Sequence, residues 1–356
     1  MAGKALVLGS GGITGAAWEV GLVAGLAARG LDLTAADLIV GTSAGSLAGA
    51  QLTSGIGLAE LYAAQCAPSE VAVTATMGRA LMLRYGLAVF TPGTAARARK
   101  RLGRVARASP PLAEAERRAV IGAWLPSHDW PAQRLVITAV DADTGECATF
   151  DAASGVSLIE AVSASCAVPG VWPPVRINGR RWMDGGMRSA ANADLAAGFD
   201  RVVVLAPLWR GMRVMPPALR QCQQLAAAGS AVVLITPNAE SATAMGNLLD
   251  SAGRADAVRA GYAQAEATLP DRTSSRTTDC SAVSRAASRA GGRPAIFPEV
   301  IRSHSDPPSC PFVSPSTATL SPAFRKTPAH VAVTSGSSPT TATVGVGMIA
   351  LPSVSL

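Results

Sequence analysis

The sequence predicts an α/β fold with a central, mainly parallel sheet and helices on both faces. Over residues 1–270, short apolar runs alternate with longer segments of helical character, the order that βαβ units produce. The runs are apolar throughout, as expected for strands that are covered on both faces. From Pro270 onward Ser, Thr, Pro and Arg dominate and the periodicity is lost. We therefore expect residues 271–356 to form a low-complexity, disordered tail.

The first strand is expected at residues 4–8, followed by the glycine-rich loop GSGGITG at residues 9–15 and a helix over residues 16–26. Such a loop presents backbone N–H groups to an anion. The anion is either a dinucleotide pyrophosphate or the oxyanion of an acyl-transfer intermediate. The dinucleotide fingerprint fails, because Thr14 stands where its last glycine belongs and no acidic residue follows the second strand.

The second unit contains the most informative motif, GTSAG at residues 41–45, between an apolar run at 38–40 and a helix over 46–52. Gly41 and Gly45 flank Ser43 in a G-x-S-x-G turn. In a strand–turn–helix setting this turn holds the serine hydroxyl exposed for nucleophilic attack. The alternative is an accidental match in a chain rich in Gly and Ala. The context favours a nucleophile.

Residues 66–130 lose the alternation and are interpreted as a candidate cap region. A basic helix in this region places Arg97, Lys100, Arg101 and Arg104 on one face. Such a face is either a solvated helix surface or a surface that contacts anionic lipid.

The predicted elements between residues 134 and 184 end at the carboxylate of Asp184. A strand at 134–140 turns into an antiparallel partner at 146–150, and Ser157 with Glu160 forms a capping box for a helix ending near residue 165. Residues 174–177 and 180–183 flank Asn-Gly, a strong hairpin signal, and Asp184 ends the hairpin. Strands at 201–205 and 231–235 and an amphipathic helix at 253–269 complete the α/β pattern.

The base that serves Ser43 is the next question. The chain has three histidines. His128 has no acidic partner in a recognisable strand-end loop, and His304 and His330 lie in the tail. A carboxylate within hydrogen-bond reach can serve instead, and Asp184 is the best candidate, although Asp-Gly-Gly is also compatible with a plain turn. A Ser–His–Asp esterase that uses one of the histidines remains the alternative.

Together these motifs carry a resemblance to a known family. SGGITG at 10–15, GTSAG at 41–45, ASCAVPG at 164–170, WPPV at 172–175 and DGG at 184–186 occur in this order. Over residues 4–270 the sequence resembles the patatin-like phospholipases. The resemblance implies a hydrolase domain at 1–270.

The same resemblance implies a role for each matched residue. Ser43 is the nucleophile and Asp184 its base, and the N–H groups of Gly11, Gly12 and Ile13 form the oxyanion hole. Two positions depart from the family pattern. Ser10 replaces a glycine, and Thr14 replaces a basic residue.

The expected function is a lipid acyl hydrolase of the phospholipase or lysophospholipase kind, with a Ser–Asp dyad and no cofactor or metal. Its expected partners are a lipid or acyl-ester substrate and, transiently, a membrane surface. The net charge is +7, of which the tail contributes eight basic and four acidic residues, so the charge of the body says little about partners. The basic residues are almost all arginine and Ala and Gly are abundant, which indicates a high-GC coding bias, and nucleic acid is not expected. The six cysteines are scattered, and no signal peptide is visible, which favours a cytoplasmic protein. The altered loop keeps a non-catalytic binding protein as a second alternative.

Overall fold

The computed structural model describes residues 3–68, 71, 73–112 and 114–268. Within them, eight strands form one sheet, linked by hydrogen bonds in the order β5-β6-β3-β2-β1-β7-β8, with β4 also paired to β3. The strands are β1 (Lys4–Leu8), β2 (Leu38–Gly41), β3 (Leu135–Asp141), β4 (Cys147–Phe150), β5 (Val175–Ile177), β6 (Arg180–Asp184), β7 (Arg201–Leu205) and β8 (Ala231–Ile235). The predicted tail, residues 271–356, lies outside the described residues.

The sheet is mainly parallel, as predicted. Strands β3, β2, β1, β7 and β8 pair in parallel, whereas β4, β5 and β6 join by antiparallel pairing. The β5–β6 hairpin turns at Asn178 and Gly179, whose φ angles of 50° and 75° are those that a two-residue type I′ turn requires.

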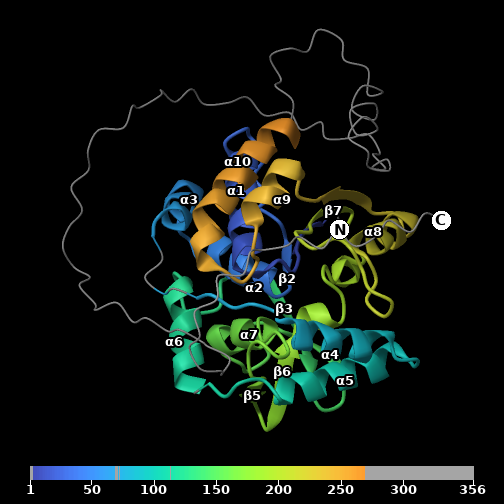
Figure 1. The fold of residues 1–356 in the computed structure, drawn as a ribbon. Helices are drawn as coiled ribbons and strands as arrows, with labels where there is room; N and C mark the ends of the chain where they lie inside the picture. The colour runs from blue at the N-terminus through green and yellow to red at the C-terminus, as the bar shows by residue number, and fades with distance from the viewer. Residues whose placement is uncertain (1–2, 69–70, 72, 113, 269–356) are drawn as a thin grey trace.

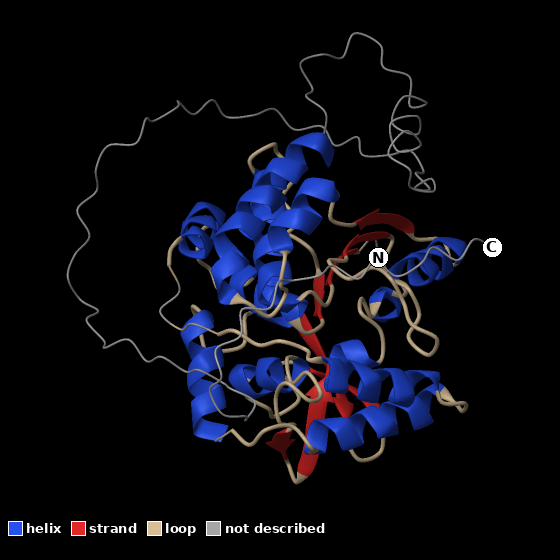
Figure 2. Ribbon diagram, in the orientation of Figure 1, coloured by secondary structure: helices blue, strands red, loops and turns tan. Residues whose placement is uncertain are grey.

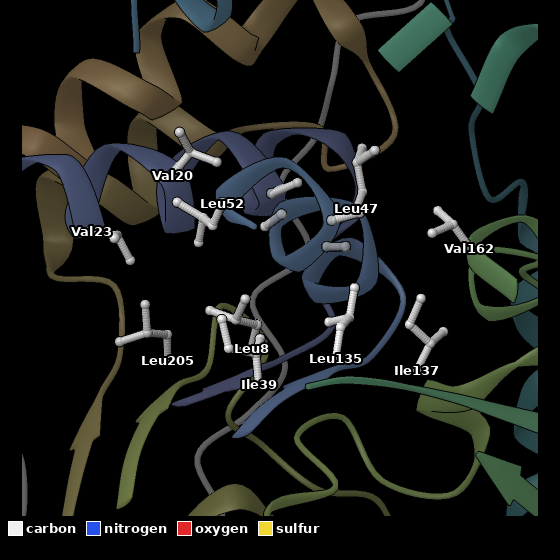
Figure 3. Close-up of a cluster of buried hydrophobic side chains, with 14 of the residues drawn as sticks. Leu8, Val20, Val23, Ile39, Leu47, Leu52, Leu135, Ile137, Val162 and Leu205 are labelled. Atoms are coloured by element: carbon white, nitrogen blue, oxygen red, sulfur yellow. The ribbon is translucent and has the colours of Figure 1, made fainter. Parts of the chain in front are cut away.

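Apolar side chains cover both faces of the sheet. Successive residues of a strand point to opposite sides, so Leu6 and Leu8 join one buried cluster while Ala5 and Val7 join another. Figure 3 shows the first cluster, in which Leu8, Ile39 and other strand residues meet the helices above them. The helices that contribute to this cluster are α1 (Gly12–Ala27), α2 (Ala44–Leu52), α3 (Leu58–Cys66), α6 (Glu114–Trp124), α7 (Leu158–Ser165), α9 (Ala239–Met245) and α10 (Arg254–Thr268).

The opposite face packs against α8 (Ala218–Ala227) and the short 3-10 turn Ala193–Ala196. Figure 2 shows the strands running through the middle of the molecule between these two groups of helices. The predicted α/β class with helices on both faces is therefore confirmed.

The candidate cap region contains three helices, α4 (Arg79–Phe90), α5 (Ala95–Arg107) and α6 (Glu114–Trp124). Helices α4 and α5 pack side by side (Figure 1). On α5, Arg97, Lys100 and Arg104 are exposed. Arg101 instead donates from Nε to the Ala88 carbonyl oxygen at 2.8 Å. It therefore links α5 to α4 and is not part of the exposed basic face formed by the other three residues. None of the helices in the described part of the chain is long and apolar enough to cross a membrane.

Candidate active site

Strand β3 brings two strand ends together. Its residue Ile137 pairs with Gly41 of β2 and with Phe150 of β4, so β2 and β4 lie on opposite edges of β3. Ala139 pairs with β4 and with Asp184 of β6, so β6 shares the β2 edge. Because β6 runs antiparallel to β3, the carboxyl ends of β2 and β6 face each other along that edge. Residues that follow β2 therefore lie beside Asp184.

The turn after β2 holds Ser43 in a strained conformation. Its φ of 53° lies in a region that non-glycine residues rarely adopt, and such strain is characteristic of functional sites. The flanking glycines are required by close contacts. A Cβ at Gly45 would lie 2.1 Å from the Leu8 carbonyl oxygen, and one at Gly41 would lie 2.7 Å from the Gly45 carbonyl oxygen.

The close approach at Gly45 gives a testable prediction. Gly45→Ala is expected to lower the free energy of unfolding by about 2 kcal/mol or more, because backbone at β1 must move to admit the methyl group. Gly86→Ala is the matched control. Gly86 lies inside α4, and a Cβ added there would meet nothing within 4 Å, so this change should stabilise by about 0.5–1 kcal/mol. Urea titration of both variants measures the difference, and equal stabilities would contradict the packing described.

Ser43 and Asp184 form a direct hydrogen bond. The Ser43 Oγ donates to Asp184 Oδ2 at 2.7 Å, and both side chains are buried. The other carboxylate oxygen accepts the Gly186 N–H at 2.7 Å. Burial raises the pKa of Asp184 to about 6, while the Ser43 and Gly186 hydrogen bonds and the nearby Arg117 charge oppose that rise. At neutral pH the carboxylate is therefore mostly ionised and basic enough to take a proton.

Several hydrogen bonds fix the backbone of Ser43. Its N–H donates to Ser165 Oγ at 2.9 Å, and its carbonyl oxygen accepts from Ser46 Oγ at 2.6 Å and from Cys166 Sγ at 3.2 Å. Ser165 and Cys166 belong to the stretch ahead of the hairpin. The serine is thus positioned by groups from α2 and from the end of α7.

Asn192 links the turn that contains Ser43 to the turn that follows Asp184. Its side-chain amide donates to Thr42 Oγ1 at 3.0 Å and to the Gly185 carbonyl oxygen at 3.3 Å. It is fully buried and in the left-handed conformation. Asn192 therefore holds the turn before Ser43 and the turn after Asp184 at a fixed separation. This residue could not be predicted as part of the site, since nothing in the sequence around position 192 relates it to either turn.

The glycine-rich loop lies beside Ser43. No acceptor for the N–H groups of Gly11 and Gly12 is found among the described residues, and Gly12 lines the cavity beside Ser43. Ile13 corrects the sequence expectation, because its N–H donates to the Leu248 carbonyl oxygen at 2.7 Å and is already used. Gly12 has a φ of 63°, and a Cβ there would lie 2.2 Å from the same Leu248 oxygen.

A buried carboxyl group supports the base of this loop. Glu19 Oε1 accepts the Gly9 N–H at 2.8 Å. Burial raises the pKa of Glu19 well above its usual range, while the hydrogen bond from Gly9 opposes that rise.

A small cavity of about 40 Å³ adjoins Ser43. Its walls are mainly apolar and come from the glycine-rich loop, the GTSAG turn, residues 73 and 75, α6, the 166–172 stretch and Leu249. The cation in this wall is Arg117 of α6, whose guanidinium lies 4.5 Å from the Trp172 ring centroid and donates to the Cys166 carbonyl oxygen at 3.0 Å. Thr14 does not line the cavity. Arg117 therefore places a positive charge in the cavity wall from the cap region. The glycine-rich loop supplies none, because it has Thr14 in place of a basic residue.

The histidine alternative finds no support in the geometry. His128 is exposed, and its Nε2 lies 3.1 Å from the Gly122 carbonyl oxygen. It does not line the Ser43 cavity. His304 and His330 fall outside the described residues.

Comparison with known proteins identifies the family. A family model described as patatin-like phospholipase matches residues 6–197, more than half of the 356 residues. No curated protein sequence matches the chain. Two solved structures are similar in part. VipD from Legionella pneumophila is 12% identical with a TM-score of 0.35, over 75% of this chain and 66% of that one. The type III effector protein ExoU is 17% identical with a TM-score of 0.31, over 74% and 54%.

The chain thus spans less than two thirds of the length of either structure, and similarities this distant say nothing about its site. The family model carries the assignment, and its match includes the glycine-rich loop, the GTSAG turn and the DGG turn. The chain belongs to the patatin-like phospholipase family.

Proposed function

We propose that the protein is a serine lipid acyl hydrolase that uses Ser43 as nucleophile and Asp184 as base. The observation that carries the proposal is the 2.7 Å hydrogen bond between the two side chains, formed beside two backbone N–H groups without acceptors among the described residues. Family membership supports lipid acyl hydrolysis in general, and the dyad is our assignment within it.

The proposed reaction follows from these positions. Asp184 takes the Ser43 proton as Oγ attacks the carbonyl carbon of an ester. The negative charge on the tetrahedral intermediate is received by the N–H groups of Gly11 and Gly12. The proton passes to the leaving alcohol, and an acyl-serine remains. Water, deprotonated by the same carboxylate, then releases the fatty acid and restores the serine.

Substrate entry requires the cavity walls to move. A volume of about 40 Å³ is far below the roughly 300–1,000 Å³ of sites that hold drug-sized ligands. The walls formed by residues 73 and 75, by α6 and by Leu249 come from segments far apart in sequence, and their separation would admit an acyl chain.

The proposal is tested by fatty acid release from phosphatidylcholine and lysophosphatidylcholine, compared with a water-soluble short-chain ester. The wild-type protein should release acid from the lipids, and Ser43→Ala should not. Ser127→Ala, in the loop after α6, is the matched serine control and should remain active. Lipid binding without acid release by the wild type would favour the non-catalytic alternative.

We further propose that α4 contacts the membrane during catalysis. Met82, Leu83, Leu87 and Phe90 are 55–65% exposed, and the spacing of 83, 87 and 90 places them on one helical face. Residues 71–112 contain eight basic and no acidic residues, which suits an anionic lipid surface. The inner side of α4 reaches the cavity wall, since the Tyr85 hydroxyl donates to the Pro169 carbonyl oxygen at 2.9 Å.

If α4 contacts the membrane, substitutions on its exposed face should reduce vesicle binding and leave catalysis unchanged. Leu83→Glu with Leu87→Glu should weaken binding to phosphatidylcholine–phosphatidylserine vesicles about tenfold or more. Hydrolysis of the short-chain ester should be unchanged. Leu208→Glu with Leu219→Glu, two other exposed leucines, is the matched control and should bind vesicles normally. Equal vesicle binding by both double variants in a sedimentation assay would contradict the assignment of this surface to α4.

A further inference from the structure

A second, larger cavity of about 300 Å³ shares one lining residue, Arg117, with the cavity beside Ser43. It is formed where the end of α5, α6, α7 and the β5–β6 hairpin meet. Prolines 111, 173 and 174, with Leu112 and Val175, form its apolar walls. Its volume falls in the range of small-ligand sites. The proposed hydrolase scheme uses none of these residues except Arg117, which lines both cavities.

Five guanidinium groups line this cavity. They belong to Arg107, Arg117, Arg118, Arg176 and Arg181. Among the described residues, two carboxylates form salt bridges with three of these arginines. Asp143 accepts from both Arg107, at 2.7 Å, and Arg181, at 2.9 Å, and Glu160 pairs with Arg118. Throughout the described residues, neither Arg117 nor Arg176 forms a salt bridge. Guanidinium groups therefore outnumber the carboxylates that pair with them, and the cavity is positively charged.

Two residues that line this cavity each have a buried side-chain atom without a partner in the described part of the chain. Ser163 is 1% exposed and Arg117 is 4% exposed. The Ser163 Oγ and the Arg117 Nε find no hydrogen-bond partner among the residues that the structure describes. A buried polar atom without a partner is destabilising by roughly 1–3 kcal/mol, so such atoms are uncommon unless a water, an ion or a ligand completes them. Here a hydroxyl and a guanidinium N–H occur together in a positively charged cavity.

We propose that this cavity binds a phosphate monoester group. Phosphate oxygens are strong acceptors, and arginine recognises them with paired N–H donors. A phosphate monoester carries nearly two negative charges at neutral pH, which matches the charge excess better than a single carboxylate does. Ser163 Oγ and Arg117 Nε would donate to its oxygens, and Arg176 would contribute charge from the edge. The phosphate monoester belongs either to a soluble compound or to a lipid headgroup.

The proposal does not depend on hydrolysis and is tested by binding alone. Calorimetry of the full chain with glycerol phosphate, and with inorganic phosphate, measures the soluble source. Sedimentation with phosphatidylcholine vesicles, with and without phosphatidic acid, measures the lipid source. Binding should weaken with added salt. Ser43→Ala protein should bind as the wild type does, so a failure of the proposed catalytic role leaves this result unaffected.

Two variants locate the site. Ser163→Ala should weaken phosphate binding about tenfold, the loss of one charge-assisted hydrogen bond, without lowering the unfolding temperature, because the hydroxyl has no partner to lose among the described residues. Arg176→Gln should weaken it a few-fold. Arg134→Gln, an exposed arginine outside the cavity, is the control and should bind normally. The proposal is overturned if no probe binds, or if Ser163→Ala and Arg176→Gln bind every probe as tightly as the control.

Discussion

Ser43→Ala and Asp184→Asn are each expected to reduce kcat for ester hydrolysis by about 10⁴-fold or more. The first change removes the oxygen that attacks the ester. The second leaves the hydrogen-bonding shape of the side chain but removes the charge that takes the Ser43 proton. Because Ser43 Oγ and Asp184 Oδ2 are hydrogen bonded to each other, we expect the two residues to act as one unit.

The double variant Ser43→Ala with Asp184→Asn tests whether the two residues act together or contribute independently to kcat. If the two residues act together, the double variant should be little slower than either single variant. Independent contributions would multiply instead. His128→Ala is the control and should retain activity, since His128 contacts Gly122 and not the dyad. Loss of activity in His128→Ala, with Asp184→Asn still active, would contradict the Ser–Asp assignment and favour a Ser–His–Asp esterase.

The pH dependence of kcat/KM is expected to have an acid limb set by Asp184. Burial raises the pKa of this carboxyl to about 6, and the proposed reaction requires its ionised form. Below that pH kcat/KM should fall about tenfold per pH unit, and above it the value should level off. A profile for a soluble ester between pH 4 and pH 8 measures it. A flat profile across this range would contradict the role of Asp184 as base.

The same raised pKa has a consequence for stability. In the unfolded chain an aspartate ionises near pH 3.9, so as pH rises above this value the unfolded state loses a proton that folded Asp184 keeps. The stabilising contribution of the neutral carboxyl is complete below the unfolded pKa and is lost as pH rises through about 6. Asp184→Asn, with no charge to bury, should therefore be more stable than the wild type at pH 8. Thermal unfolding at pH 4 and pH 8 measures this difference as an internal control for the pH profile.

Much of the fold could be predicted from local sequence signals. The strand at 4–8 agrees with β1 in both bounds, and the capping box of Ser157 and Glu160 is present at the start of α7. The Asn-Gly hairpin was found because only certain residues tolerate its positive φ angles. The helices after the two glycine-rich turns begin earlier than expected, at Gly12 and Ala44. Glycine has low helix propensity, so the first turn of each of these helices could not be predicted from the sequence.

The parts of the site that depend on distant contacts could not be predicted. Arg117 reaches the cavity from α6, and Asn192 joins two turns that are far apart along the chain. Neither residue lies in a motif, so only the tertiary fold brings them to the site. Ile13 fits the loop pattern, but the Leu248 carbonyl oxygen occupies its N–H, a contact between residues so distant in sequence that no local pattern encodes it.

The most direct measurement of the central claim is labelling with a fluorophosphonate, which reacts with a serine only when the hydroxyl is activated. Intact mass and peptide mapping should show one adduct, on Ser43. Labelling should be absent in Ser43→Ala and much slower in Asp184→Asn, while His128→Ala should label as the wild type does. An unlabelled wild-type protein, or an adduct on another serine that persists in Ser43→Ala, would contradict the account of Ser43 as a nucleophile activated by Asp184.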